Sequence, residues 1–153
     1  MPKKNEKLLK EAKNKSKPVV HKQLAALCYR KGKSGTEVLL VTSSRGRWIL
    51  PKGWPIDGKT NREAAMVEAW EEAGVKRGRI TRKAVGSFVS TKTTRDGEIM
   101  PCELKVFAVE VSKIVTDYPE AEQRDRKWVS LSKAAKMVTE DGLRDILGEF
   151  RAA

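Results

Sequence analysis

Three glutamates placed just before a glycine constrain this chain more than any other feature. Glu68, Glu71 and Glu72 lie three, four and one positions apart, and Gly74 follows them. The spacing predicts a helix with the carboxylates on one side, because successive helical residues turn by roughly 100°. Crowded like charges are relieved by a bound cation, and oxygen ligands suit Mg²⁺ or Mn²⁺. The alternative interpretation is a solvated acidic helix face that forms surface ion pairs.

The same segment has the pattern of a helix that packs against a core. Thr60 or Asn61 is a suitable N-cap, and Gly74 is a typical residue just beyond a helix that ends near Ala73. The residues predicted to form the apolar side are Ala65, Met66, Ala69, Trp70 and Ala73. We expect the glutamates on a different side of the helix, where a ligand has access to them.

Short apolar runs on both sides of this helix predict β-strands. The predicted strands are 19–29, 37–42, 48–50, 84–91, 102–111 and 127–130. The expected turns and irregular connections are 31–35, 53–58, 93–98 and 112–126. The final predicted helices are 132–138 and 140–150, the second capped by Thr139. This order indicates an α+β fold, in which helices pack on a mixed β-sheet.

Charge divides the chain into two unequal parts. The net charge is +12, and residues 1–18 hold seven Lys against two Glu with no aromatic or β-branched residue. We predict a basic tail at 1–18, either disordered or a frayed amphipathic helix, and one folded domain at 19–153. No apolar run reaches the roughly 18 residues of a membrane span, and the tail lacks the apolar region of a secretory signal. The positive field favours polyanionic partners such as nucleotides, inositol phosphates, RNA or an anionic membrane surface.

The few cysteine and histidine residues give little sign of catalytic use. Cys28 and Cys102 both lie in apolar strand-like segments. Two buried free thiols are therefore expected, which favours a reducing, cytoplasmic compartment. His21, the only histidine, is expected to be structural or exposed rather than catalytic.

Residues 53–75 resemble the Nudix box, whose pattern is G-x5-E-x7-R-E-U-x-E-E-x-G-U with U a bulky aliphatic residue. With Gly53 as the first position, the matching residues are Glu68, Glu71, Glu72, Gly74 and Val75. Lys59 replaces the first Glu of the pattern, and Val67 replaces its Arg. Residues 43–51 and 124–128 are also similar to segments of diphosphoinositol polyphosphate phosphohydrolases, a subgroup of this family.

The resemblance implies the Nudix fold, a mixed β-sheet between α-helices, and metal-dependent hydrolysis of a diphosphate linkage. It implies that Glu68 and Glu72 bind Mg²⁺ or Mn²⁺, and that Glu71 is the catalytic base or contributes to a second ion. Gly53 and Gly74 are expected to shape the motif. The Glu and the Arg that the pattern has at these two positions are possible partners in an ion pair. Here Lys59 and Val67 replace both, so neither is left as a charge without its partner, and we expect an active enzyme.

Basic and hydroxyl-bearing residues around the motif predict an anion-binding site, since guanidinium, ammonium and hydroxyl groups all donate hydrogen bonds to phosphate. The candidate substrate-binding residues are Ser43, Ser44, Arg45, Lys52, Arg124 and Lys127. Glu120 is the preferred candidate for a distal carboxylate, with Glu122 as the alternative. The four tryptophans are expected mostly in the core or as loop anchors.

These features favour a hydrolase of a highly anionic substrate, such as a diphosphoinositol polyphosphate or a dinucleoside polyphosphate. The open alternatives are an RNA 5′-pyrophosphohydrolase, a nucleoside triphosphate pyrophosphatase and a non-catalytic RNA-binding Nudix-like module. The Lys-rich tail supports RNA binding, whereas the lack of interleaved aromatic and basic residues counts against it. The sequence is compatible with a monomer or a dimer.

Overall fold

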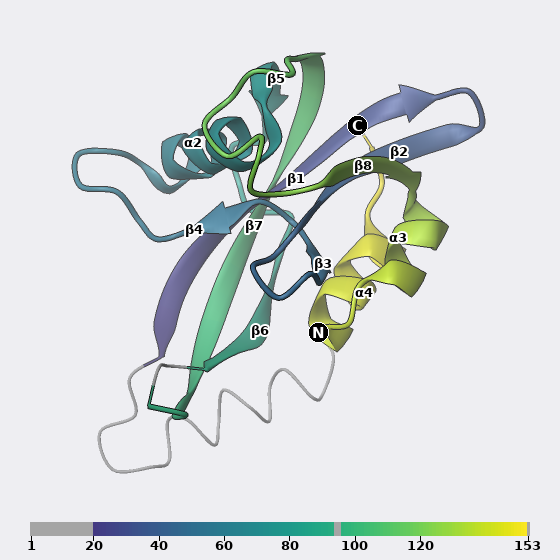
Figure 1. Cartoon of the computed structure of the whole chain (residues 1–153). Helices are drawn as coiled ribbons and strands as arrows, with labels where there is room; N and C mark the ends of the chain where they lie inside the picture. Colours follow the sequence, from purple (N-terminus) through teal and green to yellow (C-terminus); the bar gives the residue numbers. More distant parts are fainter. Residues whose placement is uncertain (1–19, 94–95, 153) are drawn as a thin grey trace.

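A mixed β-sheet forms the centre of the protein, with helices on both of its faces (Figure 1). This is a computed structural model, and it describes residues 20–93 and 96–152. The strands are β1 (His21–Gly32), β2 (Gly35–Thr42), β3 (Trp48–Ile49), β4 (Lys52–Gly53), β5 (Val75–Ile80), β6 (Gly86–Thr93), β7 (Ile99–Ile114) and β8 (Arg126–Ser130). The helices are α2 (Asn61–Ala73), α3 (Leu131–Met137) and α4 (Asp141–Glu149). The predicted α+β architecture is confirmed.

Strand β1 is the central element of the sheet. It runs parallel to β7, with His21 opposite Cys102, and antiparallel to β2 and β4. Strands β5 and β6 pair with β7, while β3 and β8 pair with β2. A continuous apolar run in β1 suits this position, because a central strand is buried on both faces.

Alternate residues of β1 enter two separate apolar cores. Ala25, Leu27 and Tyr29 pack with residues of α3 and α4. Leu24, Ala26 and Cys28 pack on the opposite face with the alanines of α2. The sheet therefore separates α2 from the C-terminal helices, and only the α2 side carries the glutamates of interest.

Most predicted elements are confirmed with small changes at their ends. The 31–35 turn joins β1 to β2, although the paired strands extend to Gly32 and start again at Gly35. The turn predicted at 93–98 includes positions 94–95, which lie outside the described residues. The basic tail predicted at 1–18 also lies outside them.

Three sequence predictions are wrong. Strand β5 was not expected, because only its first and last residues are strongly apolar; it pairs along β7 at one side of the sheet. Strand β7 continues to Ile114, into the segment predicted to be irregular. Helix α4 is preceded by Glu140 rather than Thr139 as its N-cap, and Glu140 makes no side-chain capping hydrogen bond.

The cysteines agree with the sequence analysis. Cys28 and Cys102 are buried and form no disulfide, and they belong to the two different cores. Burial raises the pKa of Cys28 to about 12. Among the described helices, none combines the length and apolar character needed to cross a membrane.

Candidate active site

Helix α2 is fixed at both ends by its own sequence. Thr60 Oγ1 accepts from the Glu63 N–H at 3.2 Å, while Glu63 Oε1 accepts from the Thr60 N–H at 2.8 Å, forming a capping box. Gly74 ends the helix with φ of 71°, in the left-handed region that favours glycine. Both helix boundaries were correctly predicted.

The sequence analysis expected the glutamates on a different side of α2 from the buried apolar residues, and Glu72 departs from this expectation. Ala65, Ala69 and Ala73 are buried, and Glu72 lies among the buried residues with only 4% of its surface exposed. Glu68 and Glu71 are half-buried. The small alanine side chains bring this face of the helix close to the sheet, and Glu72 is consequently held in the protein interior.

Strand β4 provides the partner that Glu72 needs. The backbone N–H of Lys52 donates to Glu72 Oε1 at 3.3 Å. The neighbouring Gly53 lies against the Glu68 carboxyl group, and a Cβ atom at position 53 would overlap it. A side chain at position 53 would therefore displace the Glu68 carboxyl group, so glycine serves here to leave room for that group rather than to adopt a special backbone conformation.

The side chains of Glu68 and Glu72 are hydrogen-bonded to each other. Burial is the main cause that raises the pKa of Glu72 to about 8, and the hydrogen bond with Glu68 raises it further. Burial also raises the pKa of Glu68, and Glu71 and Glu120 add to this effect by charge repulsion. Two desolvated carboxylates that share a proton are well placed to share a cation instead.

This pair fits a divalent cation that completes its coordination with other oxygen atoms. Over residues 20–93 and 96–152, no three His, Cys, Asp or Glu side chains come together as a ready-made metal cage. Mg²⁺ is commonly held by one or two carboxylates together with water and substrate phosphates. Glu68 and Glu72 match that donor set.

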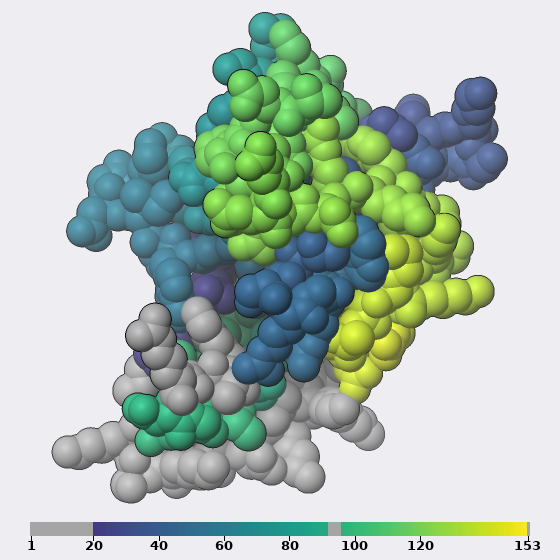
Figure 2. Space-filling model, viewed as in Figure 1, coloured from purple at the N-terminus to yellow at the C-terminus, as the bar shows by residue number. Residues whose placement is uncertain are grey.

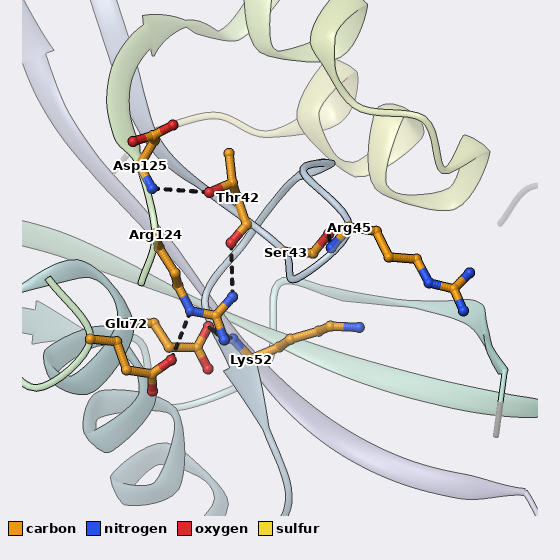
Figure 3. Close-up of polar contacts among 8 residues, drawn as sticks. Thr42, Ser43, Arg45, Lys52, Glu72, Arg124 and Asp125 are labelled. Atoms are coloured by element: carbon orange, nitrogen blue, oxygen red, sulfur yellow. Dashed lines mark hydrogen bonds and ion pairs between the residues drawn. The ribbon is translucent and has the colours of Figure 1, made fainter. Parts of the chain in front are cut away.

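Arg124 joins the carboxylates to the opposite wall of the site (Figure 3). Its Nη1 donates to the Thr42 carbonyl oxygen at 2.8 Å, and its Nε donates to Glu120 Oε1 at 2.8 Å. Its Nη2 lies 3.9 Å from Glu72 Oε1. The guanidinium is thus engaged mainly by protein groups. Arg124 therefore holds the acidic cluster in place and has few donors left for paired hydrogen bonds with a phosphate.

A cavity of about 620 Å³ opens beside the acidic pair. Figure 2 shows the hollow between the blue 43–47 loop and the blue-teal segment before α2, with purple atoms of β1 at its base. The predicted site residues on its wall are Ser43, Ser44, Arg45, Lys52, Gly53, Glu68, Glu72 and Arg124. Segments far apart in the sequence therefore meet at one anion-attracting surface.

The loop between β2 and β3 is shaped by Ser43. Its Oγ accepts from the backbone N–H groups of Arg45 at 3.3 Å and Arg47 at 3.1 Å. Gly46 adopts φ of 77° and donates its N–H to the Ser43 carbonyl at 2.9 Å. The tight loop places both arginines on the cavity wall.

Three predicted functional residues are not on the wall of this cavity: Glu71, Glu120 and Lys127. Glu120 lies beside the motif, because its N–H donates to the Glu71 carbonyl at 2.9 Å. Lys127 is exposed on β8, where it is paired with Leu40. The roles predicted for these side chains stay predictions.

Several wall residues were not assigned to the site from the sequence. These are Gln23, Arg47, Ile49, Trp54, Ser90, Thr91 and Glu140. Arg47 lies in the recognisable basic loop between β2 and β3, but the others come from strands or connections whose local sequence does not assign them to the site. The pairing of β1, β6 and β7 brings Gln23, Ser90 and Thr91 together. The other residues reach the cavity wall from β3 (Ile49), from the connection after β4 (Trp54) and from the N-cap of α4 (Glu140).

The end of the motif is closed by residues near β8. Arg126 Nη1 donates to the Ala73 carbonyl at 2.7 Å, and its guanidinium lies 4.8 Å from the Tyr118 ring centroid. A Cβ on Gly74 would meet both of these side chains. A cation at this position also complements the negative end of the helix.

The two departures from the motif lie away from these contacts. Lys59 is exposed before α2, with its N–H bonded to the Ile56 carbonyl at 3.0 Å. Val67 is half-buried. The carboxylate pair instead has a guanidinium from Arg124, which reaches it from the segment before β8.

Comparison with known proteins decides the family. The NUDIX domain model matches residues 21–149, which is most of the chain. The protein belongs to the Nudix family. Nudix hydrolase 12, mitochondrial, of Arabidopsis thaliana is 36% identical over 118 residues, covering 74% of this chain and 58% of the plant protein. Diphosphoinositol polyphosphate phosphohydrolase 3-alpha of Mus musculus is 33% identical over 121 residues, covering 76% of this chain and 68% of the mouse protein.

Solved Nudix structures confirm the fold. The C. elegans Ap4A hydrolase has a TM-score of 0.62 and 20% identity, covering 85% of this chain and 95% of that chain. The E. coli dihydroneopterin triphosphate pyrophosphohydrolase has a TM-score of 0.64 and 15% identity, covering 86% and 97% of the two chains. At these identities the similarity shows the fold alone. This Nudix chain spans 58% to 64% of the length of three plant relatives that it matches.

Proposed function

We propose that this Nudix protein is a divalent-cation-dependent hydrolase that cleaves a phosphoanhydride bond in a small polyphosphate. The single observation that carries the proposal is the hydrogen-bonded Glu68–Glu72 pair on the wall of a cavity that also contains Arg45, Arg47 and Lys52. A cation site beside several cationic side chains suits a substrate with many negative charges. The relative named as a diphosphoinositol polyphosphate phosphohydrolase supports this class.

Each residue of the site has a distinct part in the proposed reaction. Glu68 and Glu72 hold the Mg²⁺ or Mn²⁺ ion, which when bound supplies charge neutralisation and a more acidic water. Glu71 accepts the proton of the attacking water, or alternatively contributes to a second ion. Arg124 keeps the acidic pair in place through its bonds to Thr42 and Glu120.

The cationic side chains bind and orient the polyphosphate. Arg45 donates paired hydrogen bonds to phosphate oxygens, and Lys52 supplies a point charge beside the motif. Ser43 Oγ already accepts two backbone hydrogen bonds, so its O–H is the group left to donate to the substrate. Phosphoryl transfer depends mainly on such positioning and charge stabilisation.

Hydrolysis of a panel of polyphosphates with Mg²⁺ tests this proposal directly. Glu68→Gln and Glu72→Gln are expected to lower turnover by orders of magnitude, and Glu71→Gln by roughly 10²–10⁴-fold if it is the base. The exposed Glu149→Gln on α4 is the matched control, because it makes the same chemical change away from the cavity. Equal activity in all variants would reject the assignment.

RNA is the second candidate substrate, on one observation: the net charge of +12. A Lys-rich tail would attract RNA through its phosphates without regard to sequence. Deleting residues 1–17 is expected to weaken turnover strongly if a 5′-triphosphate RNA is the substrate. The same deletion is expected to have little effect on a small polyphosphate.

The compartment proposed for the protein is reducing and cytoplasmic. Two buried cysteines that form no disulfide support this proposal.

A further inference from the structure

Gln23 is a polar residue at a core position of the sheet. It lies on β1 two residues before Ala25, so its side chain is on the face that α3 and α4 cover further along the strand. Only 5% of Gln23 is exposed. At this end of β1 the apolar core gives way to the cavity, whose wall includes Gln23 and the equally buried Ser90.

Within residues 20–93 and 96–152, no group donates a hydrogen bond to the buried amide oxygen of Gln23. Among the described residues, the only other buried side-chain nitrogen or oxygen in this state is Trp128 Nε1, which is not on the cavity wall. A buried acceptor without a donor destabilises a fold, and most buried polar groups are satisfied. An acceptor left open at the edge of a binding cavity is explained if a ligand supplies the donor.

An aromatic ring lies over the same end of β1. Trp54 is on the cavity wall and is 42% exposed. It packs edge-on against His21, with ring centroids 5.8 Å apart and an interplanar angle of 80°. His21 and Gln23 are two residues apart on one strand and therefore share a face. The Trp54 ring is thus held near the open amide.

The cavity consequently offers two kinds of surface. Arg45, Arg47 and Lys52 are cationic and suit phosphate, whereas Gln23, Trp54, Ser90 and Thr91 are neutral. A diphosphoinositol pentakisphosphate carries phosphate on every ring oxygen, so its ring offers no hydroxyl donor to Gln23. A nucleoside offers amino and hydroxyl donors together with a flat base.

We propose that Gln23 and Trp54 bind the nucleoside end of a nucleoside polyphosphate. Gln23 Oε1 accepts a hydrogen bond from an amino or hydroxyl group of the nucleoside, and the Trp54 ring contacts the base. The inference rests on the proposed hydrolase function and selects the nucleotide class among its substrates. Gln23 and Trp54 are specificity-determining residues in this arrangement.

The test compares kcat/KM for diadenosine tetraphosphate and for a diphosphoinositol pentakisphosphate, both with Mg²⁺. The wild type is expected to prefer the nucleotide. Gln23→Met keeps the length of the side chain but removes the acceptor, and is expected to reduce that preference by about three- to tenfold through KM. Trp54→Leu is expected to reduce it by about fivefold or more, since stacking on a base is lost.

Trp128→Phe is the matched control, because it removes the other unsatisfied polar atom outside the cavity. It is expected to preserve the ratio of the two kcat/KM values. Thermal melting of each variant checks the fold. If Gln23→Met does not fold, Trp54→Leu still tests the inference, because Trp54 is partly exposed and its replacement disturbs the core less.

Three results would overturn the inference. Equal losses on both substrates in the Gln23 and Trp54 variants would show that the residues act only on structure. Preference of the wild type for the inositol substrate would exclude a nucleoside site while leaving the hydrolase function intact. Cleavage of neither substrate, together with no effect of Glu72→Gln on any polyphosphate, would reject the proposed function itself.

Discussion

The backbone N–H of Lys52 lies 3.3 Å from Glu72 Oε1, although the two residues are 20 positions apart in sequence. This hydrogen bond ties β4 to the C-terminal half of α2. It places the buried carboxyl group of Glu72 beside that of Glu68, which has room because residue 53 is a glycine. The geometry of the acidic pair thus depends on a two-residue strand as much as on the helix that carries it.

Gly53→Ala should lower hydrolysis by at least about tenfold while leaving the fold intact, because the added Cβ overlaps the Glu68 carboxyl group and displaces it. Gly148→Ala is a suitable control, since nothing lies within 4 Å of a Cβ at that helical position. The control should keep full activity and gain up to about 1 kcal/mol in free energy of unfolding. Full activity in Gly53→Ala would contradict the account of this contact.

Without a divalent cation, the stability of the protein should fall as the pH rises from about 5 to about 8. The pKa of Glu72 in the folded protein is about 8, above its ordinary value of 4.5. Between these values the folded state binds more protons than the unfolded state, so the free energy of unfolding decreases with pH. The slope from this group is at most about 1.4 kcal/mol per pH unit.

Urea unfolding in EDTA at several pH values measures this effect, with Glu72→Gln as the comparison. The variant should have a flatter profile because it has no proton to lose at this position. Excess Mg²⁺ should restore stability most strongly near pH 8, where the ionised pair binds it. Parallel profiles for wild type and variant would show that Glu72 is not the titrating group.

Arg124→Gln should reduce kcat/KM by roughly 10–100-fold, a range typical of groups that orient metal ligands. The substitution removes the bonds to Thr42 and Glu120 that hold the acidic cluster. Arg124→Lys should recover only part of the activity, because an ammonium group keeps the charge but lacks the planar fork. Steady-state kinetics at several Mg²⁺ concentrations would measure both losses, and full rescue by Lys would indicate that charge alone matters.

Arg126→Ala should lower the free energy of unfolding by about 1–2 kcal/mol, since it removes a partly buried cation from the end of α2. The lost contacts are the bond to the Ala73 carbonyl and the stacking on Tyr118. Arg79→Ala, at an exposed position of β5, should change stability by less than about 0.5 kcal/mol. Urea unfolding compares the two, and equal effects would remove the special role of Arg126.

Local features of the sequence predicted the fold well where local chemistry decides it. The capping residues and Gly74 fixed the limits of α2, and the apolar runs located the central strands. Strand β5 was missed because its exposed residues are charged, and only pairing with the distant β7 makes it a strand. Pattern alone cannot reveal a strand whose stability comes from its neighbour.

The site shows the same division between local and long-range information. The glutamates and the basic loop were recognised from their spacing and residue types. The burial of Glu72 was not, because it follows from the approach of β4 and the small alanines of α2. Gln23 has an ordinary strand sequence around it, and only the three-dimensional cavity distinguishes it.

The central claim is that Glu68 and Glu72 together hold a divalent cation. Crystals grown with Mn²⁺ and a non-hydrolysable polyphosphate would show its position by anomalous scattering. The account predicts one strong peak bridging the two carboxylates and the phosphate, absent in Glu72→Gln crystals. Clear ligand density in the cavity with no manganese peak beside this pair would contradict it.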